Sequence, residues 1–211
     1  MIAKAKTRAP KRAGHERRRQ ILESAQTVFA RSNYAKVGTA DLAKAAGLSE
    51  PALYRYFSGK KDLYLATLKS TGTRLLDIWR QVGGQAADPL DALWTIGLGY
   101  YDHLQSRSPV LKLFFEALSE TGDPEIRTTV RENFLAMVRF VEKTLEEGRA
   151  RGLVRGEIDL RVAAWHFMAI GLAFDLIHVL GLDGELDRAK VEAWGRLYLS
   201  SVGEKPWNPP G

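Results

Sequence analysis

Apolar residues recur at helical spacing along most of this chain, and that pattern restricts the fold more than any other feature. Between residues 14 and 31, for example, the apolar positions are Ile21, Leu22, Ala25, Val28 and Phe29, which share one face of a helix. No stretch alternates between polar and apolar residues for long, as a half-buried strand does. The sequence therefore predicts an all-α protein.

Short breaks rich in glycine, proline and capping residues separate the helical segments. Asn33 can adopt the left-handed conformation that ends a helix, Thr39 is a plausible N-cap, and Gly47 closes the segment that follows. Ser49 is a second N-cap with Pro51 in the first turn, so residues 39–57 are predicted to form a helix-turn-helix. Longer helices are then expected over residues 60–82, 88–105, 108–120, 123–150, 160–181 and 187–202.

Positive charge is concentrated near the N-terminus. Residues 1–61 hold 14 Lys/Arg and 4 Asp/Glu, whereas residues 62–211 hold 17 Lys/Arg and 21 Asp/Glu. A basic front and a mildly acidic remainder favour a polyanionic partner for the front only. The alternative is an ordinary charged surface that keeps the protein in solution.

The chain contains no cysteine, which excludes disulfides and thiolate metal sites. The basic N-terminus has no apolar run behind it, as a secretory signal does, so we expect a cytoplasmic protein. We find no GxSxG, P-loop, GxGxxG or metal-ligand spacing. The sequence therefore predicts neither an enzyme nor a bound metal or cofactor.

The helix expected over residues 49–57 has two distinct faces. Leu53 and Phe57 lie four residues apart and are predicted to face inward. The outward and flanking positions are Glu50, Pro51, Ala52, Tyr54, Arg55 and Tyr56. A tyrosine hydroxyl can donate to a phosphate, and an arginine can form two hydrogen bonds with guanine. Lys60 and Lys61 begin the next helix, whose free N–H groups also attract phosphate. The alternative is an amphipathic hairpin with a solvated face, although two aromatic rings suit that face poorly.

Residues 14–70 closely resemble the N-terminal domain of the tetracycline-repressor (TetR) family, most clearly in "ILESAQTVFA", "TADLAKAAGLS" and "ALYRYFSGKKDL". The resemblance implies about nine helices, a homodimer, and a regulator released from a double-stranded DNA operator by a small ligand. It also implies phosphate contacts from Thr39, Tyr54, Tyr56 and Lys60, and base contacts from Glu50, Pro51, Ala52 and Arg55.

The sequence departs from the family pattern in the first turn, where Ser32-Asn33 stands in place of a glycine, and at Gly38, where a hydroxyl residue often precedes Thr39. Glu50 either accepts a hydrogen bond from a cytosine amino group or only favours the start of its helix, and we prefer the second interpretation. The basic residues 1–19 either follow DNA phosphates and the minor groove or act as a solubilising tail.

Residues 75–182 are rich in large apolar side chains, most of which are expected to form the core. Long helices with many aromatic residues and a few polar groups also build apolar ligand cavities. We therefore predict a largely apolar effector of unknown identity. The candidate effector-binding residues are Trp94, Tyr101, Phe114, Phe134, Met137, Trp165, Met168 and His178. Asp175 and His178 are three residues apart and are expected to form a core pair.

Residues 162–182 are apolar and long enough to span a bilayer, but His166, Asp175 and His178 would be costly there, so we predict no membrane partner. The helix expected over residues 160–181 has more apolar residues than one protomer core needs, and the helix over residues 187–202 has an apolar stripe. We therefore expect the two helices of each protomer to form a four-helix dimer interface (the seam) around a two-fold axis, which the family resemblance also implies. The candidate seam residues are Leu172, Val191, Trp194, Leu197 and Tyr198, with Gly171 and Gly195 allowing close approach. The alternative is that both helices only close the core of one protomer.

These observations predict a disordered basic arm (1–13), a DNA-binding domain (14–60), a ligand-binding and dimerisation domain (61–203) and a flexible tail (204–211). The preferred function is a repressor released from a palindromic operator by an apolar small molecule. Two alternatives remain. One is an architectural DNA-binding protein without an effector, and the other is an all-α enzyme or carrier in which the helix-turn-helix is structural.

Overall fold

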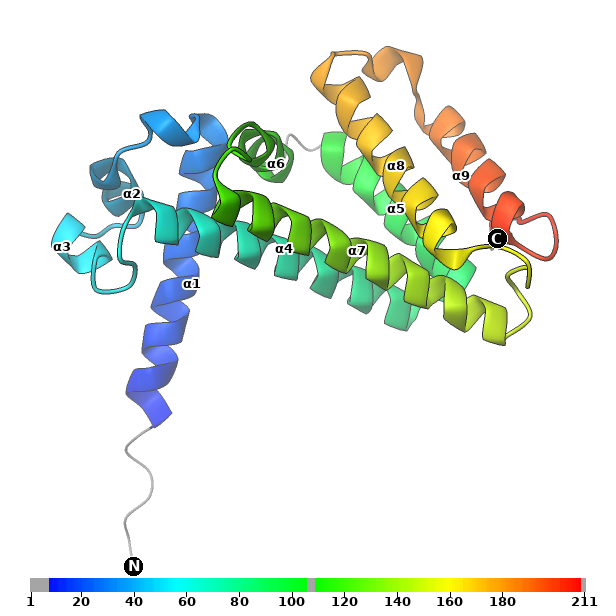
Figure 1. Ribbon diagram of the computed structural model, residues 1–211, viewed down its shortest axis with the longest axis horizontal. Coiled ribbons are helices and arrows are strands. Elements are labelled where there is room, and N and C mark those ends of the chain that lie inside the picture. The colour runs from blue at the N-terminus through cyan, green and yellow to red at the C-terminus, as the bar shows by residue number, and fades with distance from the viewer. Residues whose placement is uncertain (1–7, 106–108, 210–211) are drawn as a thin grey trace, which may run out of the picture. The chain divides into compact units, whose positions relative to one another are not determined.

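The computed structural model describes residues 8–105 and 109–209 of the 211-residue chain (Figure 1). Within these residues the backbone forms nine α-helices and two short 3-10 helices, and an isolated antiparallel bridge joins Val154 and Gly203. The predicted all-α class is therefore confirmed.

The helix bounds follow the predicted breaks closely. The α-helices are α1 (Arg8–Arg31), α2 (Thr39–Ala45), α3 (Glu50–Leu53), α4 (Lys60–Gln85), α5 (Pro89–Gln105), α6 (Pro109–Ser119), α7 (Pro124–Ala150), α8 (Leu160–Val179) and α9 (Arg188–Val202). The 3-10 helices are η1 (Tyr34–Lys36) and η2 (Asp183–Glu185). Aspartates cap several of these helices; the Asp159 carboxylate, for example, accepts hydrogen bonds from the N–H groups of Arg161 and Val162.

Helix α1 begins at Arg8, six residues before the predicted start at Gly14. Arginine, lysine and alanine are good helix formers, and extending an existing helix needs no new nucleation. Residues 8–13 of the predicted arm are therefore helical, and residues 1–7 lie outside the described residues, so the disorder of the arm stays a prediction.

Two other helix ends differ from prediction. Asn33 has an extended backbone (φ −64°, ψ 153°), and its side chain accepts a hydrogen bond from the Lys36 N–H at the start of η1. It is therefore a cap, not a left-handed helix terminator. Helix α4 continues through Gly83 and Gly84 to Gln85. A Cβ at Gly83 would lie 3.8 Å from the Phe140 ring, so this part of α4 is packed, and packing outweighs the low helix propensity of glycine.

The chain forms two compact units. Unit 1 comprises Met1–Gly72 and Pro109–Arg131, and unit 2 comprises Thr73–Ser108 and Glu132–Gly211. Helices α4 and α7 therefore each contribute to both units. Compact units are defined by contacts and the predicted domains by function, so the predicted domain bounds stay a prediction.

The core of unit 1 holds the helix-turn-helix in place. Helix α1 packs against α2 and α6 in this unit. Phe29 and Tyr64 are fully buried with ring centroids 4.7 Å apart, and the Tyr34 ring lies 4.6 Å from that of Tyr64. Leu53 and Phe57 belong to the same apolar cluster, which confirms that they face inward.

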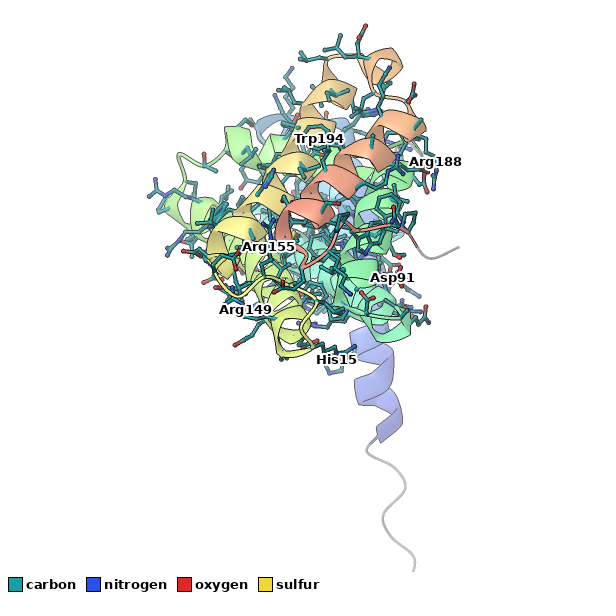
Figure 2. All side chains as sticks on the ribbon, turned by 90° about the vertical axis from the view of Figure 1, so that its right-hand side faces the viewer. His15, Asp91, Arg149, Arg155, Arg188 and Trp194 are labelled. Carbon is teal, nitrogen blue, oxygen red and sulfur yellow. The ribbon has the colours of Figure 1, made fainter. Side chains whose placement is uncertain are left out.

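Aromatic side chains and buried backbone acceptors organise unit 2, where α5 packs against α8 and α9. The Trp79 ring lies 5.7 Å from Phe140 and 6.4 Å from Phe167. After α7, the Arg149 side chain donates to the carbonyl oxygens of Arg155 and Ile158 in the connector to α8 (Figure 2).

Two further contacts close unit 2. Arg188 at the start of α9 pairs with Asp102 of α5 at 2.5 Å. In the C-terminal segment, the Trp207 ring packs tilted against Trp94 with 4.7 Å between the ring centres, and the Trp207 backbone N–H donates to the Ser200 hydroxyl at 3.0 Å. Trp207 of the predicted flexible tail is therefore packed within unit 2, because an indole ring gains more by packing than by remaining in water.

Helix α8 is long and apolar enough to cross a membrane by length and composition, with a mean hydropathy of 1.6 in its most apolar window. Only 28% of that window is buried within the chain. The excess of exposed apolar surface predicted for this helix is therefore present in the structure.

Candidate DNA-binding and effector sites

A left-handed glycine sets the turn between α2 and α3. Gly47 has φ +63°, a conformation that other residues rarely adopt without strain, and the Leu48 N–H donates to the Ala43 carbonyl at 2.9 Å. Helix α3 then ends at Leu53, earlier than the predicted Phe57. The N–H groups of Tyr56 and Phe57 both donate to the Leu53 carbonyl, so the last turn is tighter than an α-helix.

The predicted reading face of α3 is open to solvent. Tyr54 is 48% exposed, Arg55 and Pro51 are also exposed, and Ala52 and Tyr56 are half-buried on its flanks. Within the described residues, neither the Tyr54 hydroxyl nor the Arg55 guanidinium has a hydrogen-bond partner. Because Leu53 and Phe57 anchor the segment, both side chains are held outward and are available to a ligand.

Thr39 and Glu50 are engaged with each other. The Thr39 hydroxyl donates to the Glu50 carboxylate, with 2.7 Å between the oxygens. Gly38, not Thr39, is the N-cap of α2, and its N–H donates to the Asp41 carboxylate at 3.3 Å. Glu50 therefore has a specific side-chain partner, which neither sequence interpretation of this residue included.

The two lysines at the start of α4 also have partners inside unit 1. The Lys60 ammonium donates to the Tyr34 carbonyl at 3.0 Å and lies 4.6 Å above the centre of the Tyr34 ring. Lys61 pairs with Asp123 at 2.7 Å and with Glu125. Hydrogen bonding to these two carboxylates raises the pKa of Lys61 and lowers that of Asp123. Lys60 must therefore contact phosphate from this position or leave it.

Two arginines of α1 support the helix-turn-helix. Arg17 donates to the Ala46 carbonyl at 3.1 Å, at the C-terminal end of α2, where a cation is favourable. The Arg18 guanidinium lies 4.6 Å above the centre of the Phe57 ring. The sequence interpretation considered the arginines of residues 1–19 only as a DNA-binding or solubilising tail. No local pattern indicates these contacts, because the partners are distant in sequence.

The predicted effector-binding residues fall in both compact units. Phe114 belongs to unit 1, where its ring lies 5.8 Å from that of Phe115. Phe134 pairs with Trp165 at 5.5 Å in unit 2, while Met168 is buried there. Trp94 contacts Trp207, and Met137 is half-buried on α7. Aromatic residues at helical spacing cannot show which of them share a cavity, so this set stays a prediction.

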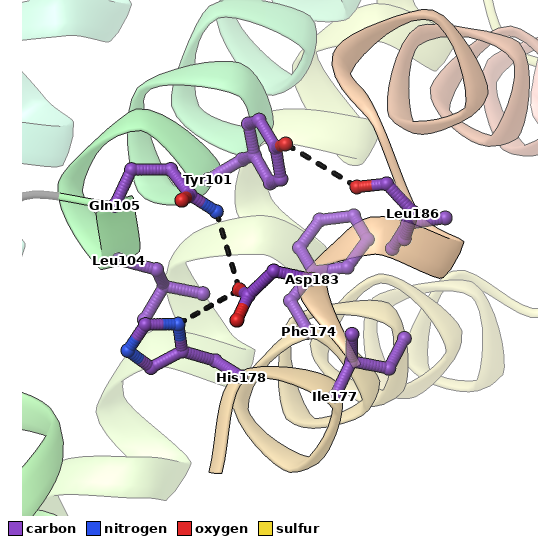
Figure 3. A pocket seen from close by; sticks show the side chains of 8 residues that line it. All are labelled: Tyr101, Leu104, Gln105, Phe174, Ile177, His178, Asp183 and Leu186. Atoms are coloured by element: carbon purple, nitrogen blue, oxygen red, sulfur yellow. Dashed lines mark hydrogen bonds and ion pairs between the residues drawn. The ribbon is translucent and has the colours of Figure 1, made fainter. Parts of the chain in front are cut away.

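Tyr101 and His178 do meet, at a small pocket of unit 2 (Figure 3). Its lining residues are Tyr101, Leu104, Gln105, Phe174, Ile177, His178, Asp183 and Leu186. The pocket has an empty volume of about 220 Å³ that includes open solvent, and its enclosed part has room for about one water molecule. Drug-sized ligands occupy about 300–1,000 Å³, so an effector does not fit here in this conformation.

Hydrogen bonds join several residues that line this pocket. One Asp183 carboxylate oxygen lies 2.9 Å from His178 Nδ1 and accepts from the Gln105 side-chain amide at 3.4 Å (Figure 3). The Tyr101 hydroxyl donates to the Leu186 carbonyl at 3.2 Å. The hydrogen bond from His178 lowers the pKa of Asp183. The predicted pairing of His178 with Asp175 is therefore wrong, because the loop before α9 brings Asp183 to the imidazole.

The predicted seam residues separate into two groups. Leu172 is exposed and Leu197 is 71% exposed, as a seam requires. Val191 and Tyr198 are almost fully buried in unit 2, where the Tyr198 hydroxyl donates to the Ala163 carbonyl. Val191 and Tyr198 are therefore core residues of one protomer, because a helical stripe does not reveal which partner it packs against.

Two other predicted features of the seam also serve the protomer. Trp194 is half-buried, and its ring lies 5.5 Å from that of Phe174. A Cβ at Gly195 would lie 2.8 Å from Trp94, so this glycine allows close packing within unit 2. Val162, Leu176 and Val179 of α8 are also exposed, and none of them was among the predicted seam residues. Trp165, predicted to bind the effector, is exposed on the same helix.

Groups of three or more His, Cys, Asp or Glu side chains that could hold a metal ion are absent among residues 8–105 and 109–209. The exposed Tyr54 and Arg55 side chains instead suit the recognition of DNA phosphates and base edges.

A sequence profile described as "Bacterial regulatory proteins, tetR family" matches residues 21–67. The HTH-type transcriptional activator FasR of Mycolicibacterium smegmatis is 31% identical over 153 residues, covering 70% of this chain and 69% of that protein. The HTH-type transcriptional repressor KstR2 of the same organism is 23% identical over 145 residues, covering 68% and 70%.

Solved structures share the fold. The transcriptional regulator FadR from Bacillus subtilis, in complex with stearoyl-CoA, superposes with a TM-score of 0.68 at 18% identity, covering 86% of this chain and 95% of that one. A TetR-family regulator from Cytophaga hutchinsonii has a TM-score of 0.74 at 17% identity, covering 92% and 98%. The described helix-turn-helix and the similarity to FasR agree with the resemblance seen in the sequence. The chain therefore belongs to the tetR family of bacterial regulatory proteins and is a DNA-binding regulator of transcription, not an enzyme.

Proposed function

We propose that this protein is a cytoplasmic homodimeric repressor that a largely apolar small molecule releases from a two-fold symmetric operator. The observation that carries the DNA-binding part is the exposed Tyr54–Arg55 pair on a segment anchored by Leu53 and Phe57. A dimer bound over a promoter blocks other proteins without further contacts, which favours repression. The relatives' names include both an activator and a repressor, so whether this protein raises or lowers transcription needs its own measurement.

The roles proposed for the DNA-facing residues follow their exposure and chemistry. Arg55 reads a base edge, with Glu50, Pro51 and Ala52 beside it in the major groove. Tyr54, Tyr56, Thr39 and Lys60 bind phosphates and set the orientation of the protein on DNA. In the predicted domain arrangement, residues 14–60 perform this reading and residues 61–203 bind the effector and the second protomer.

Homodimerisation is proposed through the exposed apolar face of α8 together with Leu197 of α9. On α8 this face consists of Val162, Trp165, Ala169, Leu172, Leu176 and Val179, spaced alternately three and four residues apart. Such spacing forms a continuous stripe suited to helix–helix packing. Two helix-turn-helix units would then reach half-sites about 34–36 Å apart, or a multiple of that distance.

The effector is proposed to be an apolar molecule, and fatty acyl thioesters are the first class to test. The fold is shared with a FadR structure solved with stearoyl-CoA. Unit 2 offers many apolar side chains, and an acyl chain needs few polar partners. An effector that binds at the Tyr101–His178 pocket requires this pocket to widen, because it is too small in this conformation. Helix α4, which runs from Lys60 to Gln85 and belongs to both units, is the proposed link to the DNA-binding segment.

The proposal is tested with the full-length protein and DNA. A duplex enriched by this protein from a random-sequence pool (the selected duplex) is compared with a duplex of the same composition in shuffled order (the scrambled duplex). We expect tight binding of the selected duplex only, and weaker binding after addition of stearoyl-CoA but not of coenzyme A alone. Failure to enrich any sequence contradicts the DNA-binding role. Enrichment that no acyl thioester weakens contradicts the acyl effector alone.

The sign of regulation is tested by transcription in vitro from a promoter that contains the selected duplex. We expect the protein to lower the yield of transcript and the released form to restore it. An increase in transcript on adding the protein contradicts repression while leaving DNA binding intact.

A further inference from the structure

The hydrogen bond between Thr39 and Glu50 joins the first residues of α2 and α3, the two short helices of the helix-turn-helix. The oxygens are 2.7 Å apart, and both residues are half-buried. A hydroxyl has one hydrogen to donate. While Thr39 donates it to Glu50, the same hydrogen is not available to a DNA phosphate.

Glu50 differs from the neighbouring acidic residues in its hydrogen-bond partner. Asp41 accepts from the Gly38 N–H, and Asp62 accepts from the Ser58 N–H at 2.9 Å and from the Ser58 hydroxyl at 3.2 Å, so each of these carboxylates binds a backbone group near a helix start. Glu50 instead binds a side chain proposed to contact DNA, and it has no lysine or arginine partner within the described residues. Its negative charge is therefore poorly compensated beside a surface that must approach phosphates.

We propose that Glu50 is a specificity-determining residue that gates the phosphate contact of Thr39. On DNA without a suitable base, the carboxylate keeps the Thr39 hydrogen and repels the nearby phosphate. On the operator, an exocyclic amino group of a base in the major groove, such as cytosine N4, donates to Glu50. Because a carboxylate can accept several hydrogen bonds, the proposal requires that the base draws the Glu50 carboxylate away from Thr39. Thr39 then rotates its hydroxyl hydrogen toward the phosphate.

The exchange makes one phosphate contact conditional on one base. The operator gains both the base contact and the phosphate contact. Other sequences gain neither contact and also leave the negative charge of Glu50 uncompensated by a base near the DNA backbone, where such a charge is costly. Glu50 would thus lower affinity for non-operator DNA more than it raises affinity for the operator.

This inference rests on the proposed function, and its test uses the selected and scrambled duplexes with the full-length protein. Glu50→Gln keeps the size of the side chain but removes the charge. We expect the variant to bind the scrambled duplex about tenfold more tightly, and its preference for the selected duplex to fall about tenfold. Asp41→Asn is the matched control, because it removes one acid from α2, the other helix of the helix-turn-helix. It should change the affinity for both duplexes by the same factor.

A double-mutant cycle with Thr39→Val separates the gate from a simple charge effect. In the wild type, Thr39→Val should weaken the selected duplex but not the scrambled one, since the hydroxyl reaches phosphate only on the operator. In the Glu50→Gln background, Thr39→Val should weaken both duplexes alike. Thr39→Ser keeps the hydroxyl and should behave as the wild type, which shows that any loss is not a folding defect.

Each result decides between the alternatives. A Glu50→Gln protein with wild-type preference, or a cycle without coupling between the two positions, overturns the gate while the wild type still selects an operator. A wild type that selects no duplex overturns the proposed function and the gate together. Sequences enriched by Glu50→Gln should also lose their preference at one base position, and retention of that preference contradicts the base contact.

Discussion

The Tyr100 hydroxyl donates a hydrogen bond to the Asp175 carboxylate, with 2.5 Å between the oxygens. Asp175 is only 3% exposed, in a helix whose other buried residues are apolar. Burial raises the pKa of Asp175 to about 6, although the Tyr100 hydrogen bond and the nearby His178 act in the opposite direction. A carboxylate is therefore held in the core of unit 2 with a neutral partner, which makes its charge expensive.

Asp175→Asn is expected to stabilise the protein at neutral pH. Because the folded state holds the proton more tightly than the unfolded chain, wild-type stability falls as the pH rises from about 4 to about 6 and stays lower above that range. The gain at pH 7.5 is up to about 3 kcal/mol, since a tenfold change in proton affinity corresponds to about 1.4 kcal/mol. Urea unfolding at pH 4.5 and 7.5 measures the difference. An equal effect at both values contradicts the buried charge.

Asp183→Asn provides the control of opposite sign. The pKa of Asp183 is lowered, chiefly by its hydrogen bond with His178, so its contribution to stability is present at neutral pH and is lost as the pH falls through the folded-state pKa. This variant should be less stable than the wild type at pH 7.5, with the difference shrinking in acid.

Gly195→Ala and Gly99→Ala should change stability in opposite directions. A Cβ at Gly195 would lie 2.8 Å from the Trp94 ring, which packs against Trp207, so the substitution should cost about 1–3 kcal/mol. No atom lies within 4 Å of a Cβ at Gly99 in α5, so alanine should add up to about 1 kcal/mol through helix propensity. Thermal unfolding of both variants tests this, and a stabilised Gly195→Ala protein would show that Trp94 moves freely.

Arg55→Ala should cost about 1–3 kcal/mol of binding to the selected duplex and relax preference at one base position. The guanidinium is exposed and has no partner within the described residues, so its loss should leave the fold intact. Arg127→Ala removes an exposed arginine of α7 in the same unit and should leave the preference unchanged. Titrations in which Arg55→Ala retains full preference contradict the assignment of this face.

Tyr54→Phe and Lys60→Ala should weaken binding to all duplexes alike, because phosphate contacts carry no sequence information. Lys60→Ala should also reduce the salt slope of binding by about one. The Lys60 ammonium is bonded to the Tyr34 carbonyl, so a lower melting temperature is expected as well. An unchanged salt slope would show that Lys60 serves only η1.

The double substitution Leu172→Glu and Leu197→Glu should yield a folded monomer that binds DNA weakly. Both side chains are exposed in the single chain, so the charges disturb only an interface between copies. Ile78→Glu is the control, because Ile78 is also exposed but lies on α4. Sedimentation should give a monomer for the double variant and a dimer for the control. A monomeric wild type that still binds the selected duplex tightly is the contrary result.

Local signals in the sequence determined much of the framework. The all-α class, the turn at Gly47 and the inward faces of Leu53 and Phe57 all depend on residues within a few positions of one another. Helical periodicity and capping chemistry act over that range, so they can be read without the fold. The helix-turn-helix and its reading face were predictable for the same reason.

The choice of partners was decided only by the tertiary structure. The Thr39–Glu50, Lys60–Tyr34 and Tyr100–Asp175 contacts join residues 11, 26 and 75 positions apart. A helical stripe shows that a residue is buried or exposed, but not which helix it meets. Hence the sequence pattern of Val191 and Tyr198 is compatible with a dimer interface as well as with a core. The spacing of Asp175 and His178 is compatible with a pair, but the fold places Asp183 beside the His178 imidazole. Long-range packing selects among locally equivalent partners, because only the folded chain fixes which side chains come within hydrogen-bonding distance.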